Sequence, residues 1–220
     1  MSVEKKRMFV EKAYEIIKEE GAENVKIRRV AEEMHCTSTV IYRYFENVQH
    51  LIALASIKFL GGYLAEFQKL TSDPELIRHP YQLNLKLWDC LAKHAFKDIV
   101  IYENLFFGEY SDSLGEIIFE YYQLFLNEEE QKFDGYATSI LFNDDIVQRD
   151  LVLLRRAAAV GVIDMKDSEA ISNIEAFVFH GVLLKYKSRD HEPGIAEKSY
   201  REFMDLLYNI ADKYSLRKKH

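Results

Sequence analysis

Proline, cysteine and tryptophan are scarce in this sequence. Its 220 residues include three prolines, two cysteines and one tryptophan. The prolines stand at positions 74, 80 and 193, so nothing between Pro80 and Pro193 forbids long helices. The two cysteines, Cys36 and Cys90, lack the close spacing of a metal-binding or redox motif. These absences exclude a disulfide scaffold and a cysteine-rich metal site.

Long apolar runs and strand patterns are missing as well. No run approaches the roughly 18 residues that a membrane-spanning helix needs. The first residues, MSVEKKRMFVEK, lack the apolar centre of a signal peptide. No segment of adequate length alternates in the manner of a strand, and no internal repeat is visible. We therefore expect an all-α protein in the reducing cytoplasm, with no membrane as a partner.

An excess of positive charge is also absent. The chain has 29 Lys and Arg against 36 Asp and Glu, a net charge of −7. Residues 1–50 contain nine of each sign, which leaves 20 basic and 27 acidic residues for positions 51–220. A nucleic-acid surface would therefore depend on bases clustered on one face of the N-terminal part. The acidic remainder suits a body held away from DNA, and equally an acidic enzyme.

The pattern over residues 27–45 predicts two short helices joined by a tight turn. Between them, Thr37 or Ser38 can cap the second helix, because a hydroxyl satisfies the N–H groups of a first turn. Two helices joined by about three residues form a helix-turn-helix. The second helix continues into Tyr42 and Arg43, groups suited to phosphates and base edges. The two apolar stripes are Ile27, Val30, Ala31 and Met34, and Val40, Ile41, Tyr44 and Phe45.

The same periodicity predicts about ten helices. Asp73 and Pro74 are typical of the start of a further short helix, and residues 133–136 and 188–194 are expected to be loops. The helix over 47–70, about 24 residues at ~1.5 Å each, would span ~36 Å and connect a small head to a larger body. The expected helices are 3–20, 27–34, 38–45, 47–70, 81–96, 98–107, 112–129, 143–160, 167–187 and 195–216.

At its start the sequence resembles the tetracycline-repressor (TetR) family. The resemblance covers roughly residues 5–55, and the rest of the chain matches only in length and helical character. It implies a three-helix helix-turn-helix DNA-binding domain at 1–47 and an effector-binding and dimerisation domain at 48–220. The matching positions are Gly21, Ile27, Val30, Ala31, Thr37, Ile41, Tyr42, Tyr44, Phe45, Asn47 and Leu51.

The resemblance implies a transcriptional regulator, expected to be a repressor, without enzymatic activity or cofactor. Such a protein binds a palindromic double-stranded DNA operator as a homodimer and is released by a small-molecule effector. The operator, the effector and the direction of regulation are not specified by the sequence.

The DNA-contacting positions include departures from the family pattern. Lys26 stands where the family usually has a small capping hydroxyl, and Thr39 and Val40 stand where it often has glycine and threonine. Arg28 corresponds to a DNA-facing site in the family, whereas Arg29 is expected on the surface or in an ion pair. The ring of Tyr44 has core packing as an equal alternative. The predicted DNA-binding residues are Lys26, Arg28, Thr37, Ser38, Thr39, Val40, Tyr42, Arg43 and Tyr44.

The middle third of the chain is rich in aromatic residues. In the family that the head resembles, the helices after the head enclose a small-molecule pocket, and this composition suits an apolar or aromatic effector. At each single position, an ordinary helical core built from Phe and Tyr is the alternative. The predicted pocket residues are Trp88, Tyr102, Phe106, Phe107, Tyr110, Tyr122 and Phe125.

The last two predicted helices each carry an apolar stripe. The resemblance implies a four-helix dimer interface built from them, which would place two recognition helices ~34 Å apart, one turn of duplex. Each stripe has ordinary core packing as its alternative. The predicted interface residues are Ile174, Val178, Gly181, Val182, Phe203, Leu207 and Ile210.

Enzyme signatures are absent from the sequence. There is no G-x-S-x-G, H-E-x-x-H, P-loop or C-x-x-C motif. One Glu-x-x-His, at Glu32 and His35, lies inside the head, and a di-iron bundle needs two such motifs and two more glutamates. His94 and Asp98, four residues apart, are interpreted as a surface pair, so no metal is expected. Two alternatives to the regulator stay open. One is a helical DNA-binding or protein-interaction module without ligand sensing, and the other is an all-α enzyme.

Overall fold

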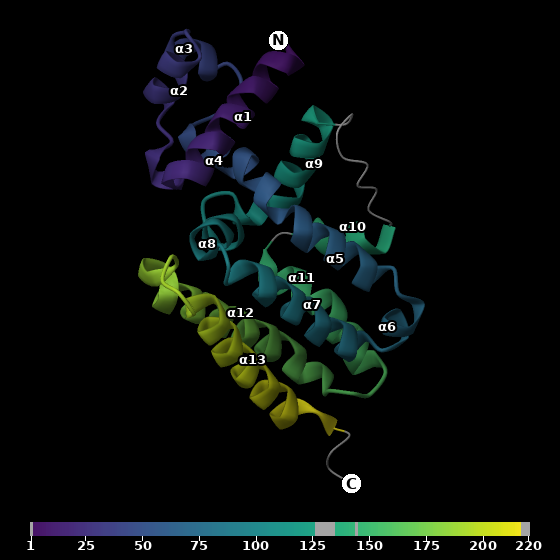
Figure 1. Ribbon diagram of the computed structural model, residues 1–220. Helices are drawn as coiled ribbons and strands as arrows, with labels where there is room; N and C mark the ends of the chain where they lie inside the picture. Colours follow the sequence, from purple (N-terminus) through teal and green to yellow (C-terminus); the bar gives the residue numbers. More distant parts are fainter. Residues whose placement is uncertain (1, 126–134, 144, 217–220) are drawn as a thin grey trace.

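The computed structural model describes residues 2–125, 135–143 and 145–216. These residues form α-helices, short 3₁₀ helices and turns, with no strand among them. Figure 1 shows α1 to α3 gathered as a head at one end, α4 leading away from it, and a stack of longer helices at the other end. The predicted all-α fold, a helix-turn-helix head followed by a helical body, is confirmed.

The first three helices of the head form around one small core. Helix α1 (Val3–Glu20) begins at Ser2, whose hydroxyl accepts a hydrogen bond from the first turn. Gly21 ends it at φ 95°, a conformation that favours glycine. Helices α2 (Ile27–Glu33) and α3 (Ser38–Ile41) follow. The buried residues of the three helices are Phe9, Val10, Ala13, Ile16, Ile17, Ile27, Val30, Ala31 and Ile41.

Helix α3 is shorter than the sequence predicts. Its α-helical geometry ends at Ile41 instead of residue 45, and residues 42–44 form a turn. The turn places Tyr44 and Phe45 against Phe9, with ring centroids 5.8 and 6.3 Å from that of Phe9. Each aromatic ring buries on the order of 150–250 Å². Burial of the two rings therefore decides where the helix ends.

The helix predicted over 47–70 is one run with a break in its middle. Asn47 caps α4 (Val48–Ser56) by accepting a backbone N–H at 2.8 Å. A 3₁₀ segment, η2 (Ile57–Leu60), separates α4 from α5 (Gly61–Thr71). Helix α5 starts with two glycines, which have low helix propensity. A 3₁₀ stretch inside a helix is a place where it can bend.

The body is a stack of paired helices. Helix α5 is followed by α6 (Pro74–Arg78), α7 (Pro80–Ala95), α8 (Ile99–Phe107), α9 (Leu114–Leu124), α10 (Gly135–Leu141), α11 (Ile146–Ala159), α12 (Ser168–Tyr186) and α13 (Ile195–Tyr214). Helix α5 packs against α7, α7 against α11, and α11 against α12. Helices α12 and α13 run side by side along one edge of the molecule (Figure 1).

The predicted helices of the body are found close to their expected bounds, with two exceptions. Helix α10 begins at residue 135, inside the predicted loop 133–136, of which residues 133 and 134 lie outside the described part. Its apolar residues have helical spacing, but seven residues are too few for a clear periodicity. The helix predicted over 112–129 is described from Leu114 to Leu124, and positions 126–129 are not described. The split run, α6 and α10 explain why the described chain has more helices than the roughly ten predicted.

The run from α4 to α5 corrects the expectation about apolar length. Within Val48–Thr71, an 18-residue window has a mean hydropathy of 1.3, so by length and composition the run could cross a membrane. In the folded chain 61 % of that window is buried. Helix α4 packs against α1 and α9, and α5 against α7. This position is typical of a core helix.

The division of the chain at residues 1–47 and 48–220 stays a prediction. Helix α4 lies just after that boundary and packs on both sides of it, against α1 of the head and against α8 and α9 of the body. The run that contains α4 is therefore the mechanical connection between the two parts.

Candidate DNA-binding surface and internal cavity

The helix-turn-helix exposes a group of cations and hydroxyls. Lys26 is the N-cap residue of α2, and its side chain makes no capping hydrogen bond. Arg28, Thr39, Tyr42 and Arg43 are exposed, Tyr42 to 57 %. They give an acidic chain a local set of phosphate-compatible groups on the two helices of the motif and the turn that follows.

The two adjacent arginines of α2 have different surroundings. Arg29 donates to both carboxylate oxygens of Glu20, at 2.5 and 2.8 Å, and to Glu33 at 2.8 Å. These hydrogen bonds raise the pKa of Arg29 and lower that of Glu20. Arg28 forms no ion pair with any described residue. Of the two alternatives predicted for Arg29, the surface or an ion pair, the structure shows the ion pair. Of these two arginines, Arg28 is the one available to a phosphate.

Four other predicted DNA-binding residues differ in access. Tyr44 and Val40 are half-buried and pack against the core of the head. Ser38 is half-buried too, whereas Thr37 is exposed. Thr37 occupies the N-cap position of α3, yet its side chain makes no capping hydrogen bond, so the predicted capping role is wrong. Of these four side chains, Thr37 has the most open access to a DNA groove.

A polar network joins the head to the body. Glu120 of α9 accepts a hydrogen bond from Lys6 of α1 and lies 3.1 Å from Nε2 of His50 of α4. Burial alone would raise the pKa of Glu120, but hydrogen bonds from His50 and Lys6 lower it to about 2. Tyr110 stacks on His50 with ring centroids 5.4 Å apart and donates to Glu46 at 3.0 Å. Glu120 of α9 therefore contacts both α1 and α4.

A small cavity, partly open to solvent, lies between α5, α7, α8, α10 and α11. Its volume is about 60 Å³, far below the roughly 300–1,000 Å³ of typical ligand pockets. Asn84, Arg149 and Asp150 are its polar side chains. The other lining residues are Tyr63, Phe67, Leu87, Trp88, Leu91, Phe106, Ile140, Leu141, Ile146 and Leu153.

Two of the predicted effector-pocket residues, Trp88 and Phe106, line this cavity. Tyr102 does not line it but stacks on Phe106 with ring centroids 6.0 Å apart. These three predicted residues, on α7 and α8, therefore lie at or next to the cavity, and their role in binding an effector stays a prediction.

The other four predicted pocket residues lie elsewhere. Phe107 stacks on His180 with ring centroids 4.0 Å apart. Tyr110 belongs to the network between head and body. Tyr122 and Phe125 are buried at the end of α9. Periodicity shows which face of a helix is apolar, but it does not show which buried face borders a cavity.

Two buried carboxyl groups meet the Trp88 indole beside the cavity. Trp88 Nε1 donates to Asp150 at 2.9 Å and to Glu175 at 3.0 Å, and Asn84 also donates to Asp150. Glu175 is fully buried and Asp150 is 8 % exposed. Burial raises the pKa of Asp150 to about 6. Burial and the adjacent Asp150 raise the pKa of Glu175 well above its ordinary value.

The sequence carries a signal for these two buried carboxyl groups. Asp150 lies on the face of α11 that Ile146 and Leu153 make apolar, and Glu175 follows Ile171 by four residues on a buried face of α12. A charged residue within an apolar stripe is unusual, because its burial needs hydrogen-bond partners. The pattern marks the two positions as unusual, but it does not show that they meet.

Replacing Glu175 with glutamine is expected to stabilise the protein more at about pH 8 than at about pH 4. A carboxyl whose pKa is raised by folding contributes stability below its unfolded pKa, about 4. That contribution is lost as pH rises through the folded pKa, which for Glu175 lies well above its ordinary value. A tenfold change in an acid dissociation constant corresponds to roughly 1.4 kcal/mol. Glu175→Gln removes one titrating group and keeps an acceptor for Trp88.

Denaturant unfolding at both pH values measures this effect. A free-energy difference between Glu175→Gln and the wild type that does not change with pH would contradict the raised pKa of Glu175. Glu169→Gln, at an exposed position on the same helix, is the matched control and should not alter the pH profile.

Three of the predicted dimer-interface residues lie inside the protomer. Val182, Phe203 and Leu207 are 4, 0 and 0 % exposed. Phe203 packs against Phe179 and Trp88, with ring centroids 5.1 and 5.7 Å away. These three residues are therefore corrected to core positions, because the inner faces of α12 and α13 must cover the aromatic core of the body.

The outer face of α12 and α13 has an apolar surface of its own. Gly181 is exposed, and Ile174, Val178 and Ile210 are half-buried, so these four predicted residues retain access to a partner. The large exposed apolar side chains on this pair of helices are Phe177 at 70 %, Tyr208 at 54 %, Leu184 at 51 % and Leu206 at 39 %.

Comparisons with known proteins bear on this arrangement. The family model of the tetR family of bacterial regulatory proteins matches residues 9–54. Over 150 residues, 64 % of this chain and 77 % of the relative, the sequence is 23 % identical to the HTH-type transcriptional regulator SAB2452 of Staphylococcus aureus (strain bovine RF122 / ET3-1).

One solved structure has a similar fold over nearly the whole length. It comes from work on the molecular basis for control of antibiotic production by bacterial hormones. The TM-score is 0.52 at 16 % sequence identity, with 96 % of this chain and 98 % of that chain covered. This similarity concerns the fold alone.

Proposed function

Because this chain belongs to the tetR family of bacterial regulatory proteins, we propose that it is a cytoplasmic repressor without catalytic activity. In this proposal it binds a palindromic operator as a homodimer and releases it when a small molecule enters the body. The observation that carries the proposal is the contrast between two neighbours on the first helix of the motif. Arg29 is ion-paired, whereas Arg28 is exposed and pairs with no acidic group in the described part of the chain.

The exposed side chains of the head divide into two roles. Lys26, Arg28 and Arg43 bind phosphates, and Tyr42 adds a phenolic hydroxyl to that set. Such contacts fix position and register but carry no sequence information. Thr39 is exposed in α3, where its methyl and hydroxyl suit a thymine methyl or a base edge. Sequence discrimination is therefore assigned to α3 and affinity to the cations.

The partner surface of the proposed dimer is the outer face of α12 and α13. Phe177 is 70 % exposed on α12. One turn later, apart from its chain neighbours and the adjacent backbone of α12, no heavy atom of the described residues lies within 4 Å of the place where a Cβ at Gly181 would stand. A second chain can approach closely at such a position. Pairing two copies of this face also covers apolar surface that is otherwise in water.

Changing Phe177 to aspartate is expected to convert a dimer into a monomer with unchanged helix content. An aspartate at position 177 would bury its charge when two copies pair, which is costly. In the isolated protomer the same side chain stays in water, so the fold is expected to be unchanged. Light scattering after size exclusion measures the mass. Phe119→Asp, at a residue 55 % exposed on α9, is the control that should leave the dimer intact. A wild-type monomer at micromolar concentration would refute the dimer.

The function is tested by selecting duplexes from a random-sequence pool with the full chain. The expected result is enrichment of a palindrome whose half-sites lie about one helical turn apart. The Phe177→Asp variant should bind that palindrome far more weakly, because each head alone covers one half-site. Selection without any enriched sequence would overturn the proposal.

The small cavity implies a mechanism for release. At about 60 Å³ it cannot admit an organic effector without expansion, so the ligand binds a conformation in which α5, α7, α10 and α11 have moved apart. The effector shifts the equilibrium by its differential affinity for the two states. Movement of α5 reaches the head through η2 and α4. An apolar or aromatic effector with one hydrogen-bonding group suits the lining of Trp88, Asn84 and Asp150.

A further inference from the structure

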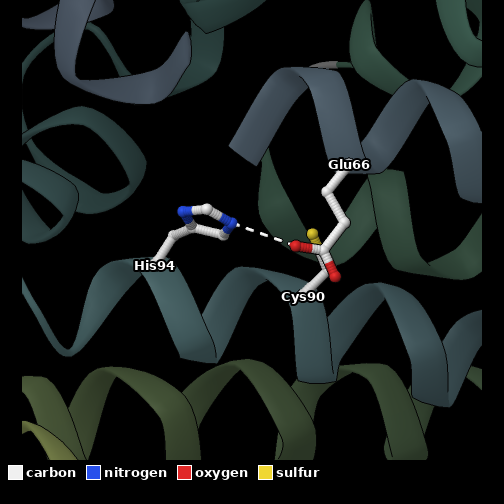
Figure 2. Close-up of side chains that lie close together, drawn as sticks. All are labelled: Glu66, Cys90 and His94. Atoms are coloured by element: carbon white, nitrogen blue, oxygen red, sulfur yellow. Dashed lines mark hydrogen bonds and ion pairs between the residues drawn. The ribbon is translucent and has the colours of Figure 1, made fainter. Parts of the chain in front are cut away.

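Three metal-type donor groups meet between α5 and α7. Figure 2 shows Glu66 of α5 pointing toward Cys90 and His94, which lie four residues apart on one face of α7. Glu66 Oε2 is 3.2 Å from His94 Nε2. One donor atom of each residue lies within 4.8 Å of the others. Coordination at ~2.0–2.3 Å needs these atoms to approach by only about an ångström.

The surrounding structure restricts the donors and leaves an entry path. A Cβ at Gly62 would stand 3.0 Å from His94 Cε1, so the histidine ring lies directly against the backbone of α5. Tyr63 contacts the same ring edge-on, with centroids 6.3 Å apart. Cys90 is fully buried. The side chains of His94 and Glu66 are 23 and 41 % exposed, so an ion can enter from solvent on that side.

The charges around the three donors favour a cation. Lys93 is the adjacent base on α7, and it is held by Asp89 at 2.7 Å. The other carboxylate oxygen of Asp89 accepts from Tyr200 at 2.6 Å. Lys93 is thus neutralised by its own partner, and Glu66 supplies negative charge at the site.

We propose that Glu66, Cys90 and His94 bind one divalent transition metal ion of the zinc class. Thiolate and imidazole donors select such an ion over Mg²⁺ and Ca²⁺, which prefer oxygen. As the bond from Cys90 Sγ forms, the thiol proton leaves to solvent. Water fills the fourth position of a tetrahedral ion. The sequence predicted no metal because the carboxylate comes from a different helix than the Cys and His.

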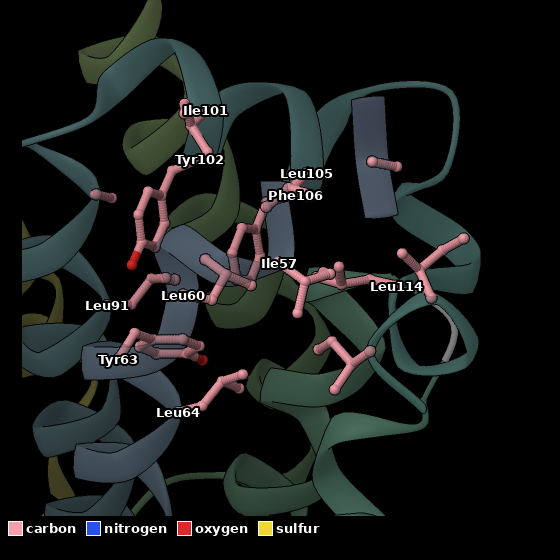
Figure 3. Close-up of a cluster of buried hydrophobic side chains, with 14 of the residues drawn as sticks. Ile57, Leu60, Tyr63, Leu64, Leu91, Ile101, Tyr102, Leu105, Phe106 and Leu114 are labelled. Atoms are coloured by element: carbon pink, nitrogen blue, oxygen red, sulfur yellow. The ribbon is translucent and has the colours of Figure 1, made fainter. Parts of the chain in front are cut away.

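Metal binding at this place has a regulatory consequence, which rests on the proposed function. The ion fastens α5 to α7 directly after the 3₁₀ segment that leads back to the head. Figure 3 shows Ile57 and Leu60 of η2 in one buried cluster with Tyr63, Leu91 and Phe106. Fixing α5 against α7 therefore sets the position of η2 and α4. In this proposal, metal binding changes the affinity of the head for DNA, and the metal site is separate from the small cavity proposed for the effector.

Cobalt(II) titration of the full-length chain tests the site without DNA. We expect one equivalent to bind with a thiolate-to-cobalt charge-transfer band in the near ultraviolet, and zinc(II) to displace it. Cys90→Ser should lose that band. Glu66→Gln should weaken cobalt binding on the order of 100-fold, since even outer-shell partners of metal ligands contribute 10–100-fold. Glu66 is partly exposed, so this variant still tests the site if Cys90→Ser fails to fold.

Two matched variants act as controls. Cys36→Ser removes the other thiol, and His79→Gln disrupts an exposed histidine–carboxylate pair, with Glu75 at 3.1 Å, that has no cysteine beside it. Both should keep the band and the affinity. No band at one equivalent, or a band that depends on Cys36 instead of Cys90, would overturn the metal site.

A second measurement separates this inference from the proposed function. Zinc(II) should change operator affinity of the wild type at least about 5-fold, in the range of typical allosteric coupling, and should not change that of Glu66→Gln. If cobalt binds at Cys90 but the chain binds no DNA, the proposed regulator function is refuted and the proposed metal site stands. DNA binding without any cobalt band refutes the metal site alone.

Discussion

Arg28→Ala is expected to weaken operator binding by on the order of 100-fold or more. A dimer loses two charge-assisted hydrogen bonds, each worth roughly 1.5–3 kcal/mol. The logarithm of the binding constant should also fall less steeply with salt, by about 1.8 in slope for two phosphates. Fluorescence anisotropy on the selected duplex over a salt series measures both quantities.

The neighbouring arginine supplies the control for this prediction. Arg29→Ala removes the same charge from a side chain that Glu20 and Glu33 already occupy, so the salt slope should stay near that of the wild type. Thr39→Ala should instead change the ranking of operator sequences. If Arg28→Ala and Arg29→Ala had equal effects, or if Thr39→Ala weakened every sequence equally, the assignment of roles would fail.

Phe179→Ala is expected to lower the free energy of unfolding by about 3–5 kcal/mol, the usual range for removing a buried aromatic ring. Phe179 is 0 % exposed, and its ring lies 5.1 to 5.7 Å from those of Phe203, Trp88 and Phe96. The loss is a large fraction of the roughly 5–15 kcal/mol that stabilises a typical domain. Urea unfolding followed by circular dichroism at one fixed protein concentration measures it.

Phe179→Leu is the matched variant, because leucine fills much of the space that alanine leaves empty. Its destabilisation should be clearly smaller than that of Phe179→Ala. A loss below about 1 kcal/mol for Phe179→Ala would mean that the aromatic cluster is not the core of the body. The oligomeric state of both variants must be checked, since α12 also carries the proposed partner surface.

The head was predictable because its signals are local. The helix predicted over 3–20 ends at Gly21, and the helix predicted over 47–70 begins just after Asn47, which caps α4. In the body, Asp73 and Pro74 start α6, as predicted. Each of these effects acts within one helical turn, so it is written in a few consecutive residues. The end of α3 was not predicted, because it depends on a contact distant in sequence. Tyr44 and Phe45 leave the helix and pack against Phe9 of α1.

The helices of the body show what hydrophobic periodicity in the sequence does not predict, namely which neighbour each apolar face packs against. A stripe on α13 correctly marked Phe203 and Leu207 as apolar, but only packing against α7 and α12 made them core rather than interface. Likewise, aromatic content pointed to a cavity, and the rotation of α7 and α8 about their axes decided that Trp88 and Phe106 line it. Relative helix rotation depends on contacts far apart in sequence.

An all-helical chain with a helix-turn-helix near its start follows from the residues alone, because hydrophobic spacing and capping act over short distances. The meeting of Asp150 and Glu175 on Trp88, and the reach of Glu66 to Cys90 and His94, needed the folded arrangement of the body. Those groups come from different helices, and their chemistry exists only where the packing of those helices brings the side chains within a few ångströms.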